Sequence, residues 1–249
     1  FENNINQKEY QLTQQIQNLE IVQEDSNNHI EQLTQANKHS ETIIQAQQES
    51  ISIANQQINS KRADKIQWKY YQYLALLFTE IYLDRYFRNK QALVADLNTF
   101  LMTNFLQREG VWAGVPDFTE DDLNKLAFWC ATGAGKTLMM QVHIKQYLYY
   151  AQKAGKLNDI NNIILLTPNE ELSRQHLEQL QKSNMSAELF SKGGLGGFFQ
   201  KQTIQVIDIN KLADTNGDKT VAVDSFQGNN LVLIDEAHKG SGGDVWMKY

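Results

Sequence analysis

The sequence is poor in the residues that constrain a chain covalently or sterically. It has one cysteine, Cys130, and two prolines among 249 residues. A single cysteine excludes an internal disulfide framework, which fits a reducing compartment. No apolar run reaches the roughly 18–20 residues that cross a bilayer, and no signal peptide is visible. We therefore expect a cytoplasmic protein with no membrane contact.

Positive charge is also scarce, and the net charge of −6 is unevenly distributed. Residues 1–60 contain eight acidic residues against Lys8 and Lys38, which accounts for the whole negative excess. Because the remaining residues are neutral overall, the composition does not indicate bulk attraction to nucleic acid. Any such contact must come from a local basic patch.

Glycine and proline are absent from residues 1–60, where 22 residues are Gln or Asn. Apolar residues recur there at alternating spacings of four and three, which is typical of a coiled-coil seam. We expect a Gln-rich arm for dimerisation or partner docking, and the alternative is a partly disordered linker. A polar cluster at residues 25–28 leaves open a helical hairpin in place of one continuous rod.

Residues 61–118 are predicted to be a helical region that packs on the domain formed by residues 119–249. Lys and Arg alternate with aromatic residues over 61–90, which fits either a nucleic-acid surface or, as we favour, an amphipathic helix. Helical spacing predicts two apolar faces. The first comprises Leu74, Leu77, Phe78, Ile81, Tyr82 and Arg85, and the second comprises Leu93, Leu97, Leu101 and Phe105.

Residues 126–138, LAFWCATGAGKTL, predict a strand over 126–130, a glycine-rich turn and a helix to about residue 152. Glycines allow backbone N–H groups to close on a phosphate, and the helix directs its positive dipole end at the anion. The Lys of such a turn binds the β- and γ-phosphates, and the hydroxyl after it binds Mg²⁺. Cys130 stands where the general pattern has its first glycine. The predicted nucleotide-binding residues are Thr132, Gly133, Ala134, Gly135, Lys136 and Thr137.

A second motif comes after the apolar run at residues 231–234, which predicts a buried strand. Asp235 and Glu236 come at its carboxyl end, where open α/β sheets place ligands. We expect Asp235 to hold Mg²⁺ together with Thr137, and Glu236 to orient the attacking water. Lys136, Asp235 and Glu236 are thus the candidate catalytic residues.

The segments CATGAGKT and IDEAH resemble motifs I and II of superfamily 2 DEAD/DEAH-box helicases and translocases. Residues 166–175, LTPNEELSRQ, are similar to motif Ia. The longer stretch IDEAHKGSGG looks most like the helicase subunit of type III restriction enzymes and related bacterial defence proteins. The resemblance covers about residues 126–249.

The resemblance implies further roles. It gives His238 a role in coupling the nucleotide site to neighbouring motifs, and it makes the pair Tyr71 and Gln72 a candidate for reading adenine. The implied contacts to nucleic acid are Thr167, Pro168, Asn169, Lys192 and Gly193. For the glycine-rich stretch around Gly193 a flexible surface loop is the favoured alternative.

The expected fold is α/β. A RecA-like P-loop domain with a parallel sheet spans 119–249, after the helical region at 61–118 and the arm at 1–60. The resemblance implies an ATP- and Mg²⁺-dependent helicase or translocase that acts on nucleic acid, DNA being favoured, in restriction or anti-phage defence. Motifs III to VI, with the arginine finger, are not present. We therefore expect a fragment, with the first RecA-like domain only, that binds ATP but hydrolyses it slowly. The alternative is a P-loop ATPase whose coiled-coil arm acts as a nucleotide-gated clamp or scaffold.

Overall fold

The computed structural model describes residues 51–109, 117–190, 202–213 and 220–236, with scattered positions between 14 and 34. The chain divides into two units, Phe1–Glu49 and Ser50–Tyr249. The described positions of the first unit are helical and exposed, and they include residues 26–28 of the alternative turn. Of the expected coiled-coil seam before residue 51, Gln23, Ser26 and Ile30 are described, and the other positions lie outside the described residues.

The second unit contains a parallel sheet, as predicted. Among the described residues, four strands lie in the order β2-β3-β1-β6, and their three pairings are parallel. The strands are β1 (Asn162–Thr167), β2 (Ala187–Leu189), β3 (Ile204–Asp208) and β6 (Asn230–Ile234). Leu165 of β1 stands beside Val206 of β3 and Leu233 of β6. The strands are parallel, and their order in the sheet differs from their order in the chain. This is the arrangement of an α/β RecA-like fold.

The expected first strand at residues 126–130 is wrong. These residues are described, but they join no sheet. Their side chains are largely exposed, with Trp129 at 95%. A strand exists only where a neighbour takes up its backbone hydrogen bonds, and among the described residues β6 pairs only with β1. An apolar run therefore did not suffice to make a strand here.

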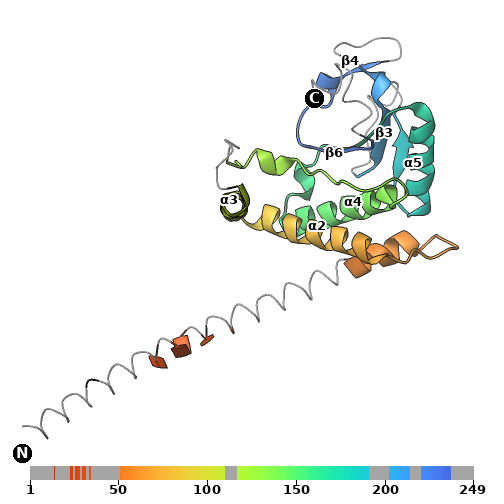
Figure 1. Cartoon of the computed structure of the whole chain (residues 1–249). Helices are drawn as coiled ribbons and strands as arrows, with labels where there is room; N and C mark the ends of the chain where they lie inside the picture. Colours follow the sequence, from red (N-terminus) through yellow and green to blue (C-terminus); the bar gives the residue numbers. More distant parts are fainter. Residues whose placement is uncertain are drawn as a thin grey trace, which may run out of the picture. The chain divides into compact units, whose positions relative to one another are not determined.

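Two helices cover one face of the sheet (Figure 1). Helix α4 (Lys136–Lys153) and helix α5 (Glu170–Lys182) contribute Ile144 and Leu180 to a core with alternate residues of β1 and β3. The opposite face packs against Phe190 and Val221, beside the two-stranded sheet of β4 (Leu212–Ala213) and β5 (Val221–Ala222). Both faces of β1 are thus buried, which explains its unbroken apolar run.

Helix α4 also has a second buried side. Helix α2 (Tyr70–Arg88) and the helical residues 51–59 pack there, so that α4 lies between α2 and the sheet (Figure 1). This core consists of Ile51, Ala54, Ile58, Leu76, Met139 and Val142. Residues 51–59 therefore belong to the same core as α4. Composition had placed them in the N-terminal arm, whose predicted boundary is residue 60.

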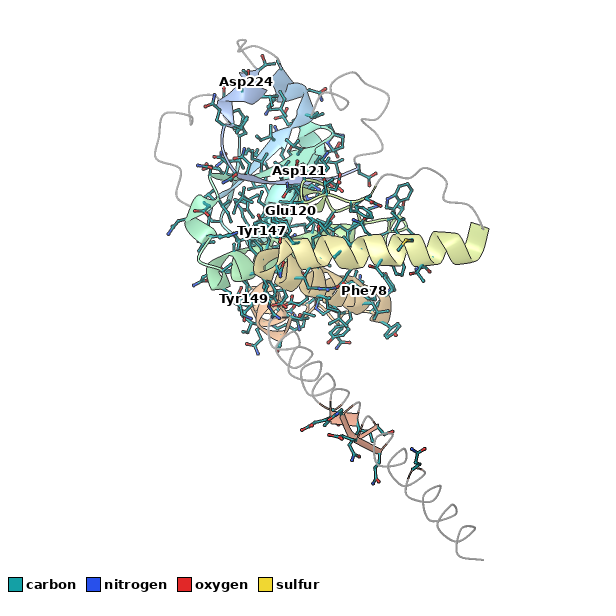
Figure 2. All side chains as sticks on the ribbon, turned by 90° about the vertical axis from the view of Figure 1, so that its left-hand side faces the viewer. Phe78, Glu120, Asp121, Tyr147, Tyr149 and Asp224 are labelled. Atoms are coloured by element: carbon teal, nitrogen blue, oxygen red, sulfur yellow. The ribbon has the colours of Figure 1, made fainter. Side chains whose placement is uncertain are left out.

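The apolar face predicted for α2 is wrong. Phe78 is 65% exposed (Figure 2), and the buried residues are Gln72, Leu76, Thr79, Glu80, Leu83 and Asp84. The reason is a polar contact with α4. The fully buried carboxylate of Glu80 accepts hydrogen bonds from Tyr150 Oη at 2.9 Å and Gln146 Nε2 at 2.6 Å. Because these partners satisfy the two carboxyl oxygens, an acidic side chain can face inward.

Helix α3 (Lys90–Glu109) comes directly after α2 and buries Leu93, the first residue of its predicted face. The basic residues at the end of α2 are engaged by acids: Arg88 pairs with Asp84 and Arg85 with Asp96. The choice between an amphipathic helix and a nucleic-acid surface for residues 61–90 stays a prediction. Short 3₁₀ turns complete the unit at Asp122–Asn124, Leu157–Asp159, Ile209–Lys211 and Val223–Ser225. Within the described ranges, every helix is too short or too polar to span a bilayer.

Candidate functional site

The glycine-rich turn leads directly into helix α4. Gly133 and Gly135 have φ of 76° and 85°, the left-handed region that L-residues with a side chain rarely adopt. Gly135 is the N-cap of α4, and its carbonyl accepts from Leu138 and Met139. The first N–H groups of this helix therefore face the turn, which is the arrangement that binds phosphate in proteins.

Helix α2 holds this turn from the other side. Gln72 Nε2 donates to the carbonyl oxygen of Ala134 at 2.7 Å, and Tyr71 Oη donates to the same oxygen at 3.2 Å. Gln72 Oε1 accepts from the backbone N–H of Lys69 at 2.9 Å. The sequence singled out Tyr71 and Gln72 for adenine, and the structure brings them to the phosphate turn, where both ends of the Gln72 amide bind protein groups.

The two motifs meet at Lys136. Its Nζ lies 3.7 Å from Glu236 Oε1 and 3.4 Å from the carbonyl oxygen of Cys130. The Lys136 and Glu236 side chains are partly buried, at 28% and 21% exposure, so solvent weakens their attraction only in part. Glu236 has φ of 54°, an uncommon value for a residue with a side chain. The distant residues Lys136 and Glu236 thus form one site at the carboxyl end of β6.

Asp235 is held by a residue that the sequence did not single out. His176 Nε2 lies 2.8 Å from Asp235 Oδ2, and the residues are 3% and 8% exposed. An ionised carboxylate only accepts, so the imidazole nitrogen donates. This hydrogen bond is the main cause of the lowered pKa of Asp235, burial opposes it, and the charge of Lys136 adds a smaller lowering. Asp235 is therefore ionised well below neutral pH.

A signal for His176 was present in the sequence. Ser173, His176 and Leu180 recur at helical spacing, and all three are buried on α5. Polar side chains on the apolar stripe of a helix need partners inside the protein. The sequence alone could not name the partner, because Asp235 lies on a distant strand.

The candidate contacts to nucleic acid divide into two kinds. Thr167 is fully buried, and its hydroxyl lies 2.6 Å from Ser173 Oγ, so the side chain supports the start of α5 and does not reach solvent. The contact of Thr167 with nucleic acid stays a prediction. Pro168 and Asn169 lie nearer the surface, and Asn169 Oδ1 caps α5 by accepting from Leu172 N at 2.9 Å.

The structure describes only some of the remaining candidate site residues. Thr132 is exposed in the turn, whereas Ala134 and Thr137 are partly buried. His238, Lys192 and Gly193 lie outside the described residues, so their predicted roles stay predictions.

The side chains present fit a magnesium nucleotide. Mg²⁺ in proteins is bound by one or two carboxylate or hydroxyl ligands, with water and substrate phosphates completing its shell. Asp235 and Thr137 could supply such ligands. Across the described ranges, no three His, Cys, Asp or Glu side chains group as a self-contained metal site.

Comparison with known proteins identifies a matching family. The family model described as "Type III restriction enzyme, res subunit" matches residues 65–248, which is most of the chain. No curated protein and no solved structure matches the chain. The family match begins before α2, so it includes the helix that holds the phosphate turn as well as both motifs.

Proposed function

The chain belongs to the family of type III restriction enzyme res subunits, which are helicase-like ATPases of restriction-enzyme type, and from this we propose that it is the ATP-binding part of a motor that moves on nucleic acid. DNA is the favoured substrate, and the context is restriction or anti-phage defence. The single observation that carries the proposal is the contact between Lys136 and Glu236 at 3.7 Å. It joins the phosphate turn to the acidic strand end in one site.

Each residue of the site then has a chemical task. The N–H groups at the start of α4 and the Lys136 ammonium bind the β- and γ-phosphates. Thr137 and Asp235 hold Mg²⁺, which when bound neutralises the charge that develops on the phosphates. Glu236 accepts a hydrogen bond from the attacking water and aligns it with the γ-phosphorus.

Nucleotide binding must compete with the contact between Lys136 and Glu236. Lys136 would turn from the carboxylate to the triphosphate, and Glu236 would lose this ion pair when nucleotide binds.

A second function fits part of these observations. A P-loop ATPase with a coiled-coil arm could act as a nucleotide-gated clamp or protein scaffold. It would use the same site but would not separate strands. The acidic excess of residues 1–60 favours a protein partner for the arm over nucleic acid.

The site is tested by Lys136→Ala with Lys153→Ala as the matched control. Both lysines belong to α4, but Lys153 is in the last turn, at the opposite end from the phosphate turn. We expect Lys136→Ala to lower the affinity for a fluorescent ATP analogue at least about tenfold, because a charge-assisted contact is worth about 1.5–3 kcal/mol. Lys153→Ala should bind like the wild type. Equal binding by all three proteins would reject the proposed site.

Strand-displacement and translocation assays on duplex DNA, with the complete gene product, separate the two functions. A motor shows ATP-dependent strand separation or movement that Lys136→Ala abolishes. A clamp shows nucleotide-dependent retention of DNA or a protein without either activity.

A further inference from the structure

The Asp235 carboxylate is held by hydrogen bonds from the protein. His176 Nε2 donates to Oδ2 at 2.8 Å, and the backbone N–H of Asp235 donates to Leu166 O at 3.0 Å. The side-chain contact fixes the rotation of the carboxylate, and the backbone contact fixes the strand end that carries it. The backbone N–H of Glu236 also donates to the Asp235 carboxylate.

The burial of this pair makes the contact strong. His176 and Asp235 are both shielded from water, and hydrogen bonds to a charged acceptor are stronger than those between neutral groups. Removing one partner leaves a buried polar group without this bond, which is unfavourable. Such a contact can hold a ligand in place before the metal arrives.

Helix α5 connects this contact to another part of the molecule. The helix starts at Glu170, directly after the cap at Asn169, and its second turn brings His176 to Asp235. Ser173, one turn before His176, is bonded to Thr167 at the end of β1. The start of α5 and the acidic strand end are therefore joined through one helix with buried polar contacts.

We infer that His176 is a positioning residue that orients Asp235 for Mg²⁺ and makes the metal site depend on the placement of helix α5. The inference rests on the proposed function, since it assumes that Asp235 binds the metal of a magnesium nucleotide. His176 touches neither nucleotide nor metal. It acts through Asp235, as residues behind a metal ligand do when they fix its orientation and raise metal affinity.

The experiment measures binding of a fluorescent ADP analogue to the full chain over a Mg²⁺ titration. The variants are His176→Leu, which fills the space but cannot donate, and His176→Gln, whose amide N–H reaches about as far as Nε2. Gln181→Ala is the control, because Gln181 is an exposed residue of the same helix. Asp235→Asn tests the metal ligand itself.

We expect His176→Leu to raise the Mg²⁺ concentration at half-effect by about 10- to 100-fold. His176→Gln should recover most of this loss, and Gln181→Ala should match the wild type. Nucleotide affinity in EDTA should be equal in all of them. An unchanged Mg²⁺ dependence in His176→Leu, with a lost dependence in Asp235→Asn, would overturn the role of His176 and leave the proposed function intact. If Asp235→Asn also kept the full Mg²⁺ dependence, the metal site itself would be rejected.

Should His176→Leu fail to fold, the wild type still decides the question. In NMR spectra of protein with ¹⁵N-labelled histidine, the resonances of the His176 ring are those that disappear in His176→Gln. Its Nε2 should carry the proton, and its resonance should move when Mg²⁺ is added to the nucleotide-bound protein. A ring with Nε2 unprotonated, or a resonance that ignores Mg²⁺, would contradict the inference.

Discussion

His143 shows how a single side chain can make the fold sensitive to pH. It lies on α4, where its ring stacks on Phe128 at 4.4 Å between centroids and its Nδ1 lies 3.0 Å from Gln146 Oε1. Burial lowers the pKa of His143 to about 4 from an ordinary value of 6.5. The folded protein therefore favours the neutral ring.

Between pH 4 and 6.5 the unfolded chain binds the proton and the folded protein does not. The free energy of unfolding should then fall as the pH drops through this window, by up to about 3 kcal/mol for this residue. His143→Gln removes the titrating group, so its stability should fall less between pH 7 and pH 4.5 in urea denaturation. The same loss in wild type and variant would contradict the assignment to His143.

The phosphate turn is an element whose two glycines differ in their surroundings. A Cβ on Gly133 would meet no atom within 4 Å, whereas a Cβ on Gly135 would lie 2.5 Å from Gln72 Nε2. Both have positive φ, so alanine at either position incurs a backbone penalty of about 1–2 kcal/mol. Gly135→Ala must in addition push Gln72 away from its bond to Ala134.

We expect Gly133→Ala to lower the free energy of unfolding by the backbone penalty alone. Gly135→Ala should lower it by about 1 kcal/mol more, for the lost hydrogen bond. Gln72→Ala loses that bond already, so the double variant Gln72→Ala/Gly135→Ala should be more stable than the sum of the single changes predicts. Strict additivity in denaturant unfolding would show that Gln72 does not hold the turn.

The sequence predicted elements well where one local pattern decided the outcome. The turn, helix α4 and strand β6 all agree with expectation. The predictions were wrong where a residue distant in the chain determined the local structure. Residues 126–130 had the composition of a strand but no paired neighbour, and α2 turned its acidic side inward because Tyr150 and Gln146 could satisfy Glu80.

The same distinction holds for the site. Lys136, Asp235 and Glu236 were identified from motif spacing, and the structure places Lys136 against Glu236. His176 was missed, since its role depends on a contact between α5 and β6 that no local pattern contains. Gln72 was found by likeness, but its contact with Ala134 required the packing of α2 on α4.

At the scale of the whole molecule, the division of the chain can be tested by truncation. Ile51, Ala54 and Ile58 are buried against Leu76 of α2 and against α4. Asn59 Oδ1 also accepts from Ile66 N at 2.7 Å, which fixes the link between the two helical segments. Residues 51–59 are thus part of the core of the second unit.

Removal of residues 1–49 should leave the thermal unfolding temperature of the second unit nearly unchanged. Removal of residues 1–60 deletes three buried apolar side chains, and each large one is worth about 1.5–3 kcal/mol. That shorter chain should unfold at a clearly lower temperature and bind nucleotide more weakly. Equal melting of both truncated chains in calorimetry would show that the segment adds nothing to the core.

At position 236, the residue that the proposed activity requires differs from the residue that the backbone conformation favours. The Glu236 φ of 54° suits Gly or Asn better than Glu, yet neither of these could act as the proposed base. Random mutagenesis followed by selection for thermal stability alone should therefore enrich Gly or Asn at this position. The selected proteins should lack ATPase activity. Genes that retain Glu236 are therefore expected to be under selection for ATP hydrolysis. The identity of this residue would distinguish genes that encode active enzyme from genes that have lost the activity.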